Sequence, residues 1–130
     1  GVIVTGFPNF YQMVGPNTGL GHNTVVFMIE CQARYIISAI KALANRKAGY
    51  LNVKPERQKE YNQQLQKKLS TMVWQTGCNS WYQDKDGHNF TIWPGSTLSY
   101  YWHTKKLLVH NYQWHDVEEQ LSSIKIPVQN

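Results

Sequence analysis

Gly15-Pro16-Asn17-Thr18-Gly19-Leu20-Gly21-His22-Asn23 is the stretch that decides how this 130-residue chain is organised. It lies between an extended apolar run and a long apolar segment with helical periodicity, and no side chain before Glu30 is formally charged. Glycines let a backbone approach a ligand closely, and the free N–H groups of a first helical turn favour an anion or an electron-rich oxygen. The pattern predicts a turn whose main chain contacts a ligand. A purely structural strand-to-helix turn is the alternative.

The segments on either side of this turn predict a strand before it and a helix after it. Residues 1–5 are short and β-branched, residues 6–9 favour a turn, and the aromatic, uncharged run 10–14 is typical of a central parallel strand buried on both faces. A helix is expected from Asn23 or Thr24 to about Lys47, ending at Gly49. Its first two turns should be buried all round, and its core stripe should comprise Val26, Ile29, Ala33, Ile36, Ile40 and Leu43.

The second half of the chain predicts one more long helix and several short strands. A strand over 50–53 precedes a helix that begins at Pro55 and is ended by Gly77, with Tyr61, Leu65, Leu69 and Met72 as its apolar stripe. Asp-Gly at 86–87 indicates a hairpin between 81–82 and 90–93, residues 99–102 form a strand or a packed loop, and residues 116–123 form a short helix. The fold class is therefore α+β: two long helices packed with a small, mainly antiparallel sheet.

Composition bounds the class of protein. The hydrophobic content of 42% supports a core, and no apolar run approaches the roughly 20 residues needed to cross a bilayer, so we expect a soluble, cytoplasmic chain. No signal peptide is visible, and a glycine rather than methionine at position 1 indicates an excised piece. Cys31 and Cys78 are too few for a disulfide framework, and Cys31 should be a buried thiol. Nine of the thirteen basic residues fall between 34 and 68, which favours a solvated helical face or attraction to phosphate.

Known site motifs are incomplete in this chain. The 15–23 turn lacks the lysine of a phosphate-binding P-loop and the third glycine of a dinucleotide fingerprint. The five histidines form no zinc-ligand spacing, so no metal is expected, and no catalytic residue is assigned. Aromatic residues concentrate from 74 to 114, where they could fill the core, stack on sugars or bases, or line a substrate pocket. The pocket candidates are Trp81, Tyr82 and Trp93.

Two ordered series of residues carry a resemblance to a known family. The first comprises Phe7-Pro8-Asn9, Gly15-Pro16-Asn17-Thr18, Leu20-Gly21-His22-Asn23 and the helical run 27–36. The second comprises Val73-Trp74, Gly77-Cys78, Ser80-Trp81-Tyr82, Asn89, Thr91 and Trp93-Pro94-Gly95. Together they resemble the C-terminal portion of class B flavoprotein monooxygenases, the flavin-containing and Baeyer–Villiger type, over residues 1–104.

The resemblance implies a larger enzyme that binds FAD and NADPH and inserts one oxygen atom into a ketone or a heteroatom substrate. It implies that residues 1–49 supply the last strand of the FAD domain, the flavin-facing loop and its helix, and that residues 50–130 supply a C-terminal helix and an aromatic, β-rich region. The cofactor contacts would come from Gly15, Pro16, Asn17, Thr18, Leu20, Gly21, His22 and Asn23. A helix N-terminus aimed at the flavin N1 edge would stabilise the reduced ring, because that edge carries negative charge.

The departures from the family pattern predict that the chain does not act alone. Both glycine-rich nucleotide fingerprints are missing, as are the signature between them and the upstream active-site arginine. We therefore expect a fragment that holds one wall of the flavin site, without tight FAD binding or turnover. An unpaired apolar strand invites pairing with a second copy, so residues 1–14 should form a homo-oligomer interface. Our main expectation is that the chain binds neither nucleic acid nor a membrane. The alternative is a non-catalytic module that binds sugar or single-stranded nucleic acid through aromatic stacking and basic charge.

Overall fold

A computed structural model describes residues 1–19, 24–72 and 87–116 of the chain. Its elements, in chain order, are helix α1 (Val25–Arg46), strand β1 (Ala48–Val53), helix α2 (Pro55–Leu69), helix α3 (Thr97–Thr104), the 3-10 turn η2 (Val109–Asn111) and strand β2 (Tyr112–Asp116). The expected α+β class with two long helices is confirmed. Helix α2 ends at Leu69, so the predicted helix that runs to Gly77 is wrong over residues 70–72. The described residues do not include Gly77, Cys78, Trp81, Tyr82, the Asp-Gly turn up to residue 86 or most of the predicted 116–123 helix.

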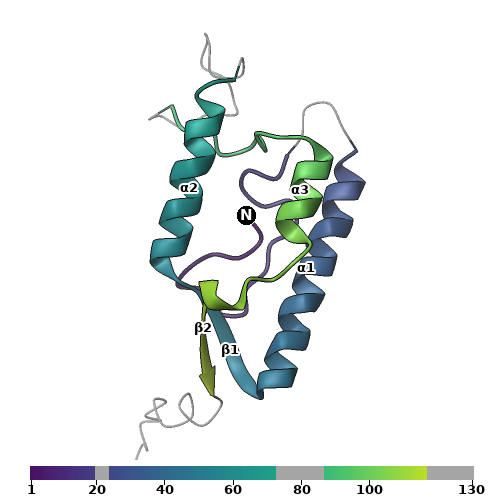
Figure 1. Cartoon of the computed structure of the whole chain (residues 1–130), viewed down its shortest axis with the longest axis vertical. Helices are drawn as coiled ribbons and strands as arrows, with labels where there is room; N and C mark the ends of the chain where they lie inside the picture. The colour runs from purple at the N-terminus through teal and green to yellow at the C-terminus, as the bar shows by residue number, and fades with distance from the viewer. Residues whose placement is uncertain (20–23, 73–86, 117–130) are drawn as a thin grey trace, which may run out of the picture.

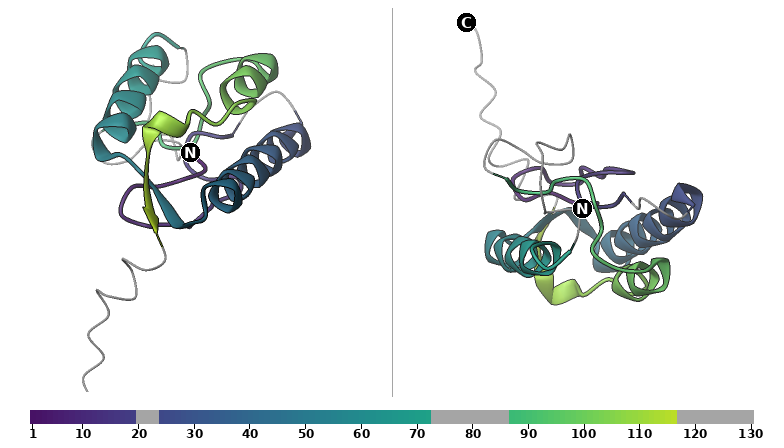
Figure 2. Two further views of the ribbon diagram at one scale, coloured as in Figure 1. Left: turned by 60° about the horizontal axis from the view of Figure 1, so that its bottom comes forward. Right: turned by 90° about the horizontal axis from the view of Figure 1, so that it is seen from above.

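The helices stand on two sides of the N-terminal segment. Figure 1 shows α1 and α3 next to each other on one side, α2 on the other, and the β1–β2 pair at one end. The two further views in Figure 2 keep α3 beside α1 and keep the N-terminal segment between them and α2. None of the described helices is long and apolar enough to cross a membrane.

Helix α1 ends earlier than the glycine pattern predicted. Lys47, with φ 53°, adopts the left-handed conformation, and its backbone N–H donates to Ala44 at 3.2 Å. Gly49 is instead a residue of β1. The predicted stop at Gly49 is therefore wrong, because Lys47 itself takes the left-handed turn that glycine was expected to supply and the strand begins directly afterwards.

The buried face of α1 also differs from the predicted stripe. Its buried residues are Met28, Cys31, Gln32 and Ala39, whereas Val26 and Ile40 are more than half exposed. The prediction that the first two turns are buried all round is also wrong, because Val25 and Val26 are exposed. Apolar residues occupy more than one side of this helix, so periodicity alone does not say which side meets α3 and the N-terminal segment. Cys31 is a buried free thiol, as expected, and burial raises its pKa.

The predicted buried strand over residues 10–14 does not form. The N-terminal segment folds back on itself, with one antiparallel bridge between Ile3 and Tyr11, and Phe10 and Val14 are about half exposed. Asn9, with φ 55°, lies against the edge of β1, where its backbone N–H donates to Leu51 and its side-chain oxygen accepts from the Leu51 N–H. These bonds to β1 satisfy the backbone groups of Asn9 and Leu51 without the two flanking strands that a central strand would need.

The described sheet consists of two antiparallel strands with a register that pairs Leu51 with Trp114 and Val53 with Tyr112. Asp116 ends β2, and the helix that it is predicted to cap lies outside the described residues. Residues 90–93 form no hairpin strand among the described residues. Ile92 instead makes a parallel bridge with Gly19.

Residues 99–102 belong to α3, which corrects the expectation of a strand or loop. Ser96 caps this helix, because its side-chain oxygen accepts from the Ser99 N–H at 3.2 Å. The cap and the contact of α3 with α1 outweigh the strand preference of the aromatic run Tyr100-Tyr101-Trp102.

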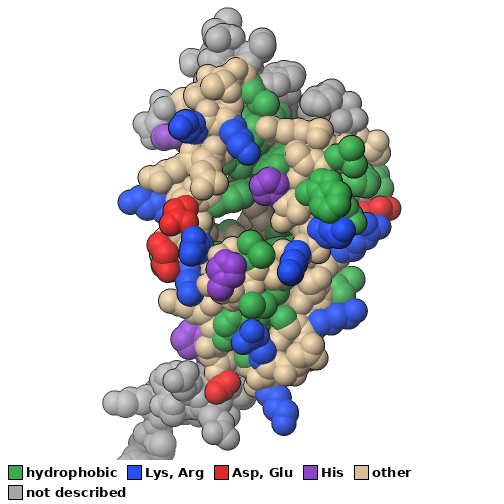
Figure 3. Space-filling view, viewed as in Figure 1, with side chains coloured by type: hydrophobic (Ala, Val, Ile, Leu, Met, Phe, Trp, Pro, Cys, Tyr) green, Lys and Arg blue, Asp and Glu red, His purple; other side chains and the backbone are tan. Residues whose placement is uncertain are grey.

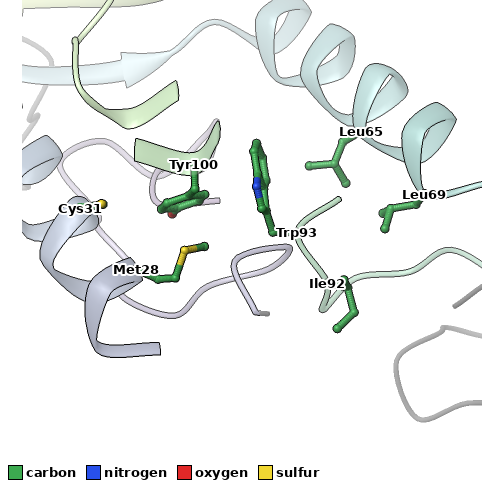
Figure 4. Close-up of a cluster of buried hydrophobic side chains, with 7 residues drawn as sticks. All are labelled: Met28, Cys31, Leu65, Leu69, Ile92, Trp93 and Tyr100. Atoms are coloured by element: carbon green, nitrogen blue, oxygen red, sulfur yellow. The ribbon is translucent and has the colours of Figure 1, made fainter. Parts of the chain in front are cut away.

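The main core joins the two sides of the molecule through Trp93. Figure 4 shows its ring between Tyr100 and Met28 on one side and Leu65 and Leu69 of α2 on the other. Tyr100 meets the Trp93 ring edge-on, with the ring centres 5.1 Å apart. A second cluster, built on Ala39, Leu51 and Tyr112, packs the β pair against α1. The core therefore holds the segment around Trp93 in place, and that segment in turn positions the turn at 15–19.

Candidate functional site

The turn over residues 15–19 is bound along one side to the segment 89–93. The Asn17 N–H donates to the Phe90 carbonyl at 2.8 Å, and the Gly19 N–H donates to the Thr91 carbonyl at 2.9 Å. The Trp93 N–H returns a bond of 2.7 Å to the Gly19 carbonyl. These amides are therefore committed to the fold, and the N–H groups of Asn17 and Gly19 are not available to a ligand.

Asn17 and Thr18 hold the turn in shape. Asn17 adopts φ 56°, and its side-chain amide donates to the carbonyls of Asn89 at 2.7 Å and Ile92 at 3.1 Å. The Thr18 hydroxyl donates to the Gly15 carbonyl at 2.6 Å. Both side chains are buried. Asparagine tolerates the left-handed conformation better than most residues, so it can supply both the turn and the bonds.

Asn89, whose carbonyl accepts from the Asn17 side chain, is a residue of this site that the sequence does not predict. It is fully buried, and its side-chain oxygen accepts from the N–H groups of Thr91 at 3.1 Å and Ile92 at 2.9 Å. Its carbonyl accepts from the Gln66 side chain at 2.9 Å, which connects the segment to α2. The available signal was the Asn-Phe-Thr run at 89–91, which reads as an inert glycosylation sequon when considered alone.

An open groove of about 460 Å³ lies beside the turn. No charged side chain lines it, and its lining comprises Gln12, Met13, Val14, Gly15, Pro16, Gly19, Phe90 and Thr91. The Gln12 side-chain oxygen is buried there without a hydrogen-bond partner among the described residues. A Cβ at Gly15 would come 2.3 Å from the Gly1 carbonyl oxygen, and a Cβ at Gly19 would come 3.0 Å from the Thr91 carbonyl oxygen. Both positions therefore require close backbone approach.

The first turn of α1, which follows the 15–23 stretch in the chain, contains no acidic residue. Thr24 precedes the helix, and its side chain makes no capping bond. The N-terminal end of a helix carries about half a positive charge, which here is not neutralised by a carboxylate of the first turn. Gln32 ties the helix to the groove, because its side-chain oxygen accepts from the Val14 N–H at 2.8 Å and its amide donates to the Tyr100 hydroxyl at 3.0 Å.

The structure brings together only part of the predicted cofactor site. Gly15, Pro16 and Gly19 line the groove, whereas Asn17 and Thr18 lie buried beneath it. The predicted contacts Leu20, Gly21, His22 and Asn23 lie outside the described residues, as do Trp81 and Tyr82. Trp93 is buried and does not line the groove. Its indole N–H bonds the Ser99 hydroxyl at 3.2 Å, and its ring lines a separate cavity between the helices.

An uncharged groove bordered by backbone suits a flat ring that is neutral when oxidised and carries one ring N–H, as the isoalloxazine of FAD does. An FAD-binding monooxygenase of Aspergillus niger is 39% identical over 105 residues, which cover 77% of this chain and 17% of that protein. A Baeyer–Villiger monooxygenase of Pseudomonas aeruginosa is 48% identical over 99 residues, which cover 75% of this chain and 19% of that protein. A Baeyer–Villiger monooxygenase of Streptomyces coelicolor is 38% identical over 117 residues, covering 87% of this chain and 22% of that protein.

This chain is related to the flavin-dependent Baeyer–Villiger monooxygenases. The resemblance read from its motifs is thereby confirmed, while no family model matches the chain. It spans about a fifth of the length of these curated relatives.

Solved structures support the fold of this monooxygenase segment. A steroid monooxygenase bound to NADP matches 89% of this chain and 22% of its own with a TM-score of 0.75 at 21% identity. Cyclohexanone monooxygenase from Rhodococcus sp. Phi1 bound to NADP+ matches 89% of this chain and 23% of its own with a TM-score of 0.74 at 17% identity. The matched proteins are monooxygenases, so these comparisons do not support a sugar- or nucleic-acid-binding module.

Proposed function

We propose that this chain is a segment of an FAD- and NADPH-dependent monooxygenase that inserts one oxygen atom into a carbonyl or heteroatom substrate. The 48% identity to a Baeyer–Villiger monooxygenase is the observation that carries the proposal. The uncharged groove beside the 15–19 turn supports it, because a flat ring could lie there against backbone rather than against charged side chains.

Some residues of the 15–19 turn line the groove, and others hold the turn in shape. Gly15, Pro16 and Gly19 supply the wall that meets the cofactor, together with residues 20–23. Asn17 and Thr18 are predicted cofactor contacts, but they instead hold the backbone of the turn in position. Asn17 does so through its bonds to the segment at 89–92, and Thr18 through its bond to Gly15. The flavin, when bound, supplies the activation of dioxygen, and the chain supplies an uncharged surface that keeps water and competing acids away from it.

The side-chain oxygen of Gln12, which has no hydrogen-bond partner among the described residues, is a candidate acceptor for the cofactor. Gln12 lines the groove while its oxygen is enclosed by the fold, so a ring N–H would pair with this oxygen once the side chain turns toward the groove. Leaving a buried acceptor unsatisfied costs about 1–3 kcal/mol, and a ligand that pairs with it recovers that cost. The proposed FAD contact at Gln12 therefore adds both affinity and orientation.

Trp81, Tyr82 and Trp93 are proposed to border the substrate, and residues 1–49 and 50–130 are proposed as the FAD-domain piece and the C-terminal piece. Without the nucleotide fingerprints, the chain alone is expected neither to bind FAD tightly nor to turn over. Phe7, Phe10, Met13 and Val14 are exposed apolar side chains, which supports a homo-oligomer through residues 1–14.

A chimera tests the proposal with a direct readout. The matched 99-residue stretch of the P. aeruginosa monooxygenase is replaced by the corresponding stretch of this chain, and the purified protein is assayed for bound FAD and for ketone-dependent NADPH oxidation. We expect near-stoichiometric FAD and measurable oxidation. The same chimera with Asn17→Ala should lose FAD occupancy, whereas Glu60→Gln, an exposed change on α2, should not.

The result that would overturn the proposal is a folded chimera, with native-like circular dichroism, that holds no FAD. Binding of stoichiometric FAD by the 130-residue chain alone would refute the narrower claim that it forms only one wall. Salt-sensitive binding of the chain to an oligonucleotide would favour the alternative of a nucleic-acid module.

A further inference from the structure

A second hollow, the central cavity, lies where the N-terminal segment and the three helices meet. It has a volume of about 260 Å³, and its walls come from residues 2–3, β1, α1, α2, α3 and the start of β2. In Figure 3 it opens near the middle of the face, between the side of α2 and the side of α3. It is distinct from the groove beside the 15–19 turn, because the two share none of their lining residues.

The walls of the central cavity are mostly aromatic. Tyr35, Tyr61, Trp93, Tyr100 and Tyr112 contribute rings from five different positions along the chain. Burial raises the pKa of Tyr61 to about 12 and raises the pKa of Tyr35, Tyr100 and Tyr112 in the same direction. These hydroxyls are therefore neutral at physiological pH, and the walls suit a flat apolar molecule.

The charged side chains that line the cavity are all basic types. Arg57 on α2 and Lys106 after α3 line it, as does His103, and no aspartate or glutamate does. Arg57 bonds Glu60 at 2.9 Å through one terminal nitrogen, but a guanidinium has five N–H donors, so further donors remain. No described carboxylate forms a salt bridge with Lys106. Figure 3 shows basic and histidine side chains around the opening, and acidic side chains on the outer side of α2, at the right edge and near the lower end of the molecule.

We propose that the central cavity binds a small aromatic or aliphatic carboxylate, with the apolar part between Tyr61 and Trp93 and the carboxylate between Arg57 and Lys106. Opposite-charge pairing supplies selectivity for the anion, and the aromatic walls supply affinity for its ring or chain. This site does not include the FAD groove, because none of its residues belongs to the 15–19 turn, and it shares only Trp93 with the proposed substrate border.

The test is a calorimetric titration of the 130-residue chain with naphthoate, and with naphthamide as the neutral analogue of the same shape. We expect naphthoate to bind about tenfold more tightly than naphthamide, and raising the salt concentration to remove most of that difference.

Three variants locate the binding. Arg57→Gln and Lys106→Gln should each weaken naphthoate binding about threefold to tenfold and leave naphthamide unchanged. Lys59→Gln removes the same charge from an exposed position of α2 that does not line the cavity, and it should change neither. All three positions are exposed, so circular dichroism should show an unchanged fold.

The proposal is overturned if naphthoate and naphthamide bind equally, if neither binds at millimolar concentration, or if Lys59→Gln weakens naphthoate as much as the two cavity variants do. Failure of the chimera to hold FAD would leave these expectations unchanged. The two proposals are therefore tested separately.

Discussion

Asn17→Ala is the substitution that best tests how the 15–19 turn is held. It removes the two bonds from the Asn17 side chain to the carbonyls of Asn89 and Ile92. The Asn89 carbonyl keeps its bond from Gln66, but the Ile92 carbonyl loses the only side-chain donor described for it. A buried acceptor left without a partner costs about 1–3 kcal/mol.

The backbone adds a second cost. Asn17 has φ 56°, and alanine is disfavoured in that conformation by about 1 kcal/mol more than asparagine. The free energy of unfolding should therefore fall by about 2–4 kcal/mol. Asn17→Gly loses the same bonds but relieves the backbone, so it should be less destabilising than Asn17→Ala by about 1 kcal/mol.

Urea unfolding followed by circular dichroism measures these differences. Asn52→Ala is the matched control, because the Asn52 side chain accepts one exposed bond from the Gly6 N–H, and its loss should cost about 0.5 kcal/mol. A loss of less than about 0.5 kcal/mol for Asn17→Ala would refute the account of the turn, since such a small change is that of an unsupported surface side chain. Equal effects of alanine and glycine would refute the backbone part alone.

Three further outcomes follow from the packing and the buried tyrosines. Gly19→Ala places a Cβ 3.0 Å from a facing backbone carbonyl, so thermal unfolding should show about 1–3 kcal/mol of destabilisation; an unchanged melting temperature would contradict the close approach. Met28→Ala, at a fully buried position, should cost about 2–5 kcal/mol in urea unfolding, while Val26→Ala at a 59% exposed position should cost about 0.5 kcal/mol or less; similar costs would contradict the assigned face of α1. Burial raises the pKa of Tyr35 and Tyr112, so the folded state holds these protons more tightly than the unfolded chain, whose tyrosines have a pKa of about 10. The contribution of these two tyrosines to the free energy of unfolding should thus be constant below about pH 10 and fall as the pH rises toward the raised pKa values. An unfolding free energy that stays flat from about pH 10 to about pH 11.5 would be the contrary result.

Much of the architecture could be predicted from local sequence. The sequence predicts the helix over Val25–Arg46, the helix start at Pro55 and most of the strand over Ala48–Val53, because periodicity and proline at a helix start act over a few neighbours. The end of the second helix at Leu69 is not predicted, since the expected stop is Gly77. The motif series also indicated the monooxygenase relationship, because the order and spacing of its residues survive without any knowledge of contacts.

Only tertiary structure could decide the rest, because the deciding bonds join residues far apart in the chain. Residues 10–14 have the composition of a buried strand, yet the bonds of Asn9 to β1 and of Val14 to Gln32 turn them into an exposed return segment. The glycine turn looked free to donate its amides, but the segment at 89–93, more than seventy residues away in sequence, occupies the N–H groups of Asn17 and Gly19. Composition determines which segments can be helical, apolar or charged. The tertiary structure determines which backbone N–H groups remain free for a ligand, because distant carbonyls accept hydrogen bonds from the others.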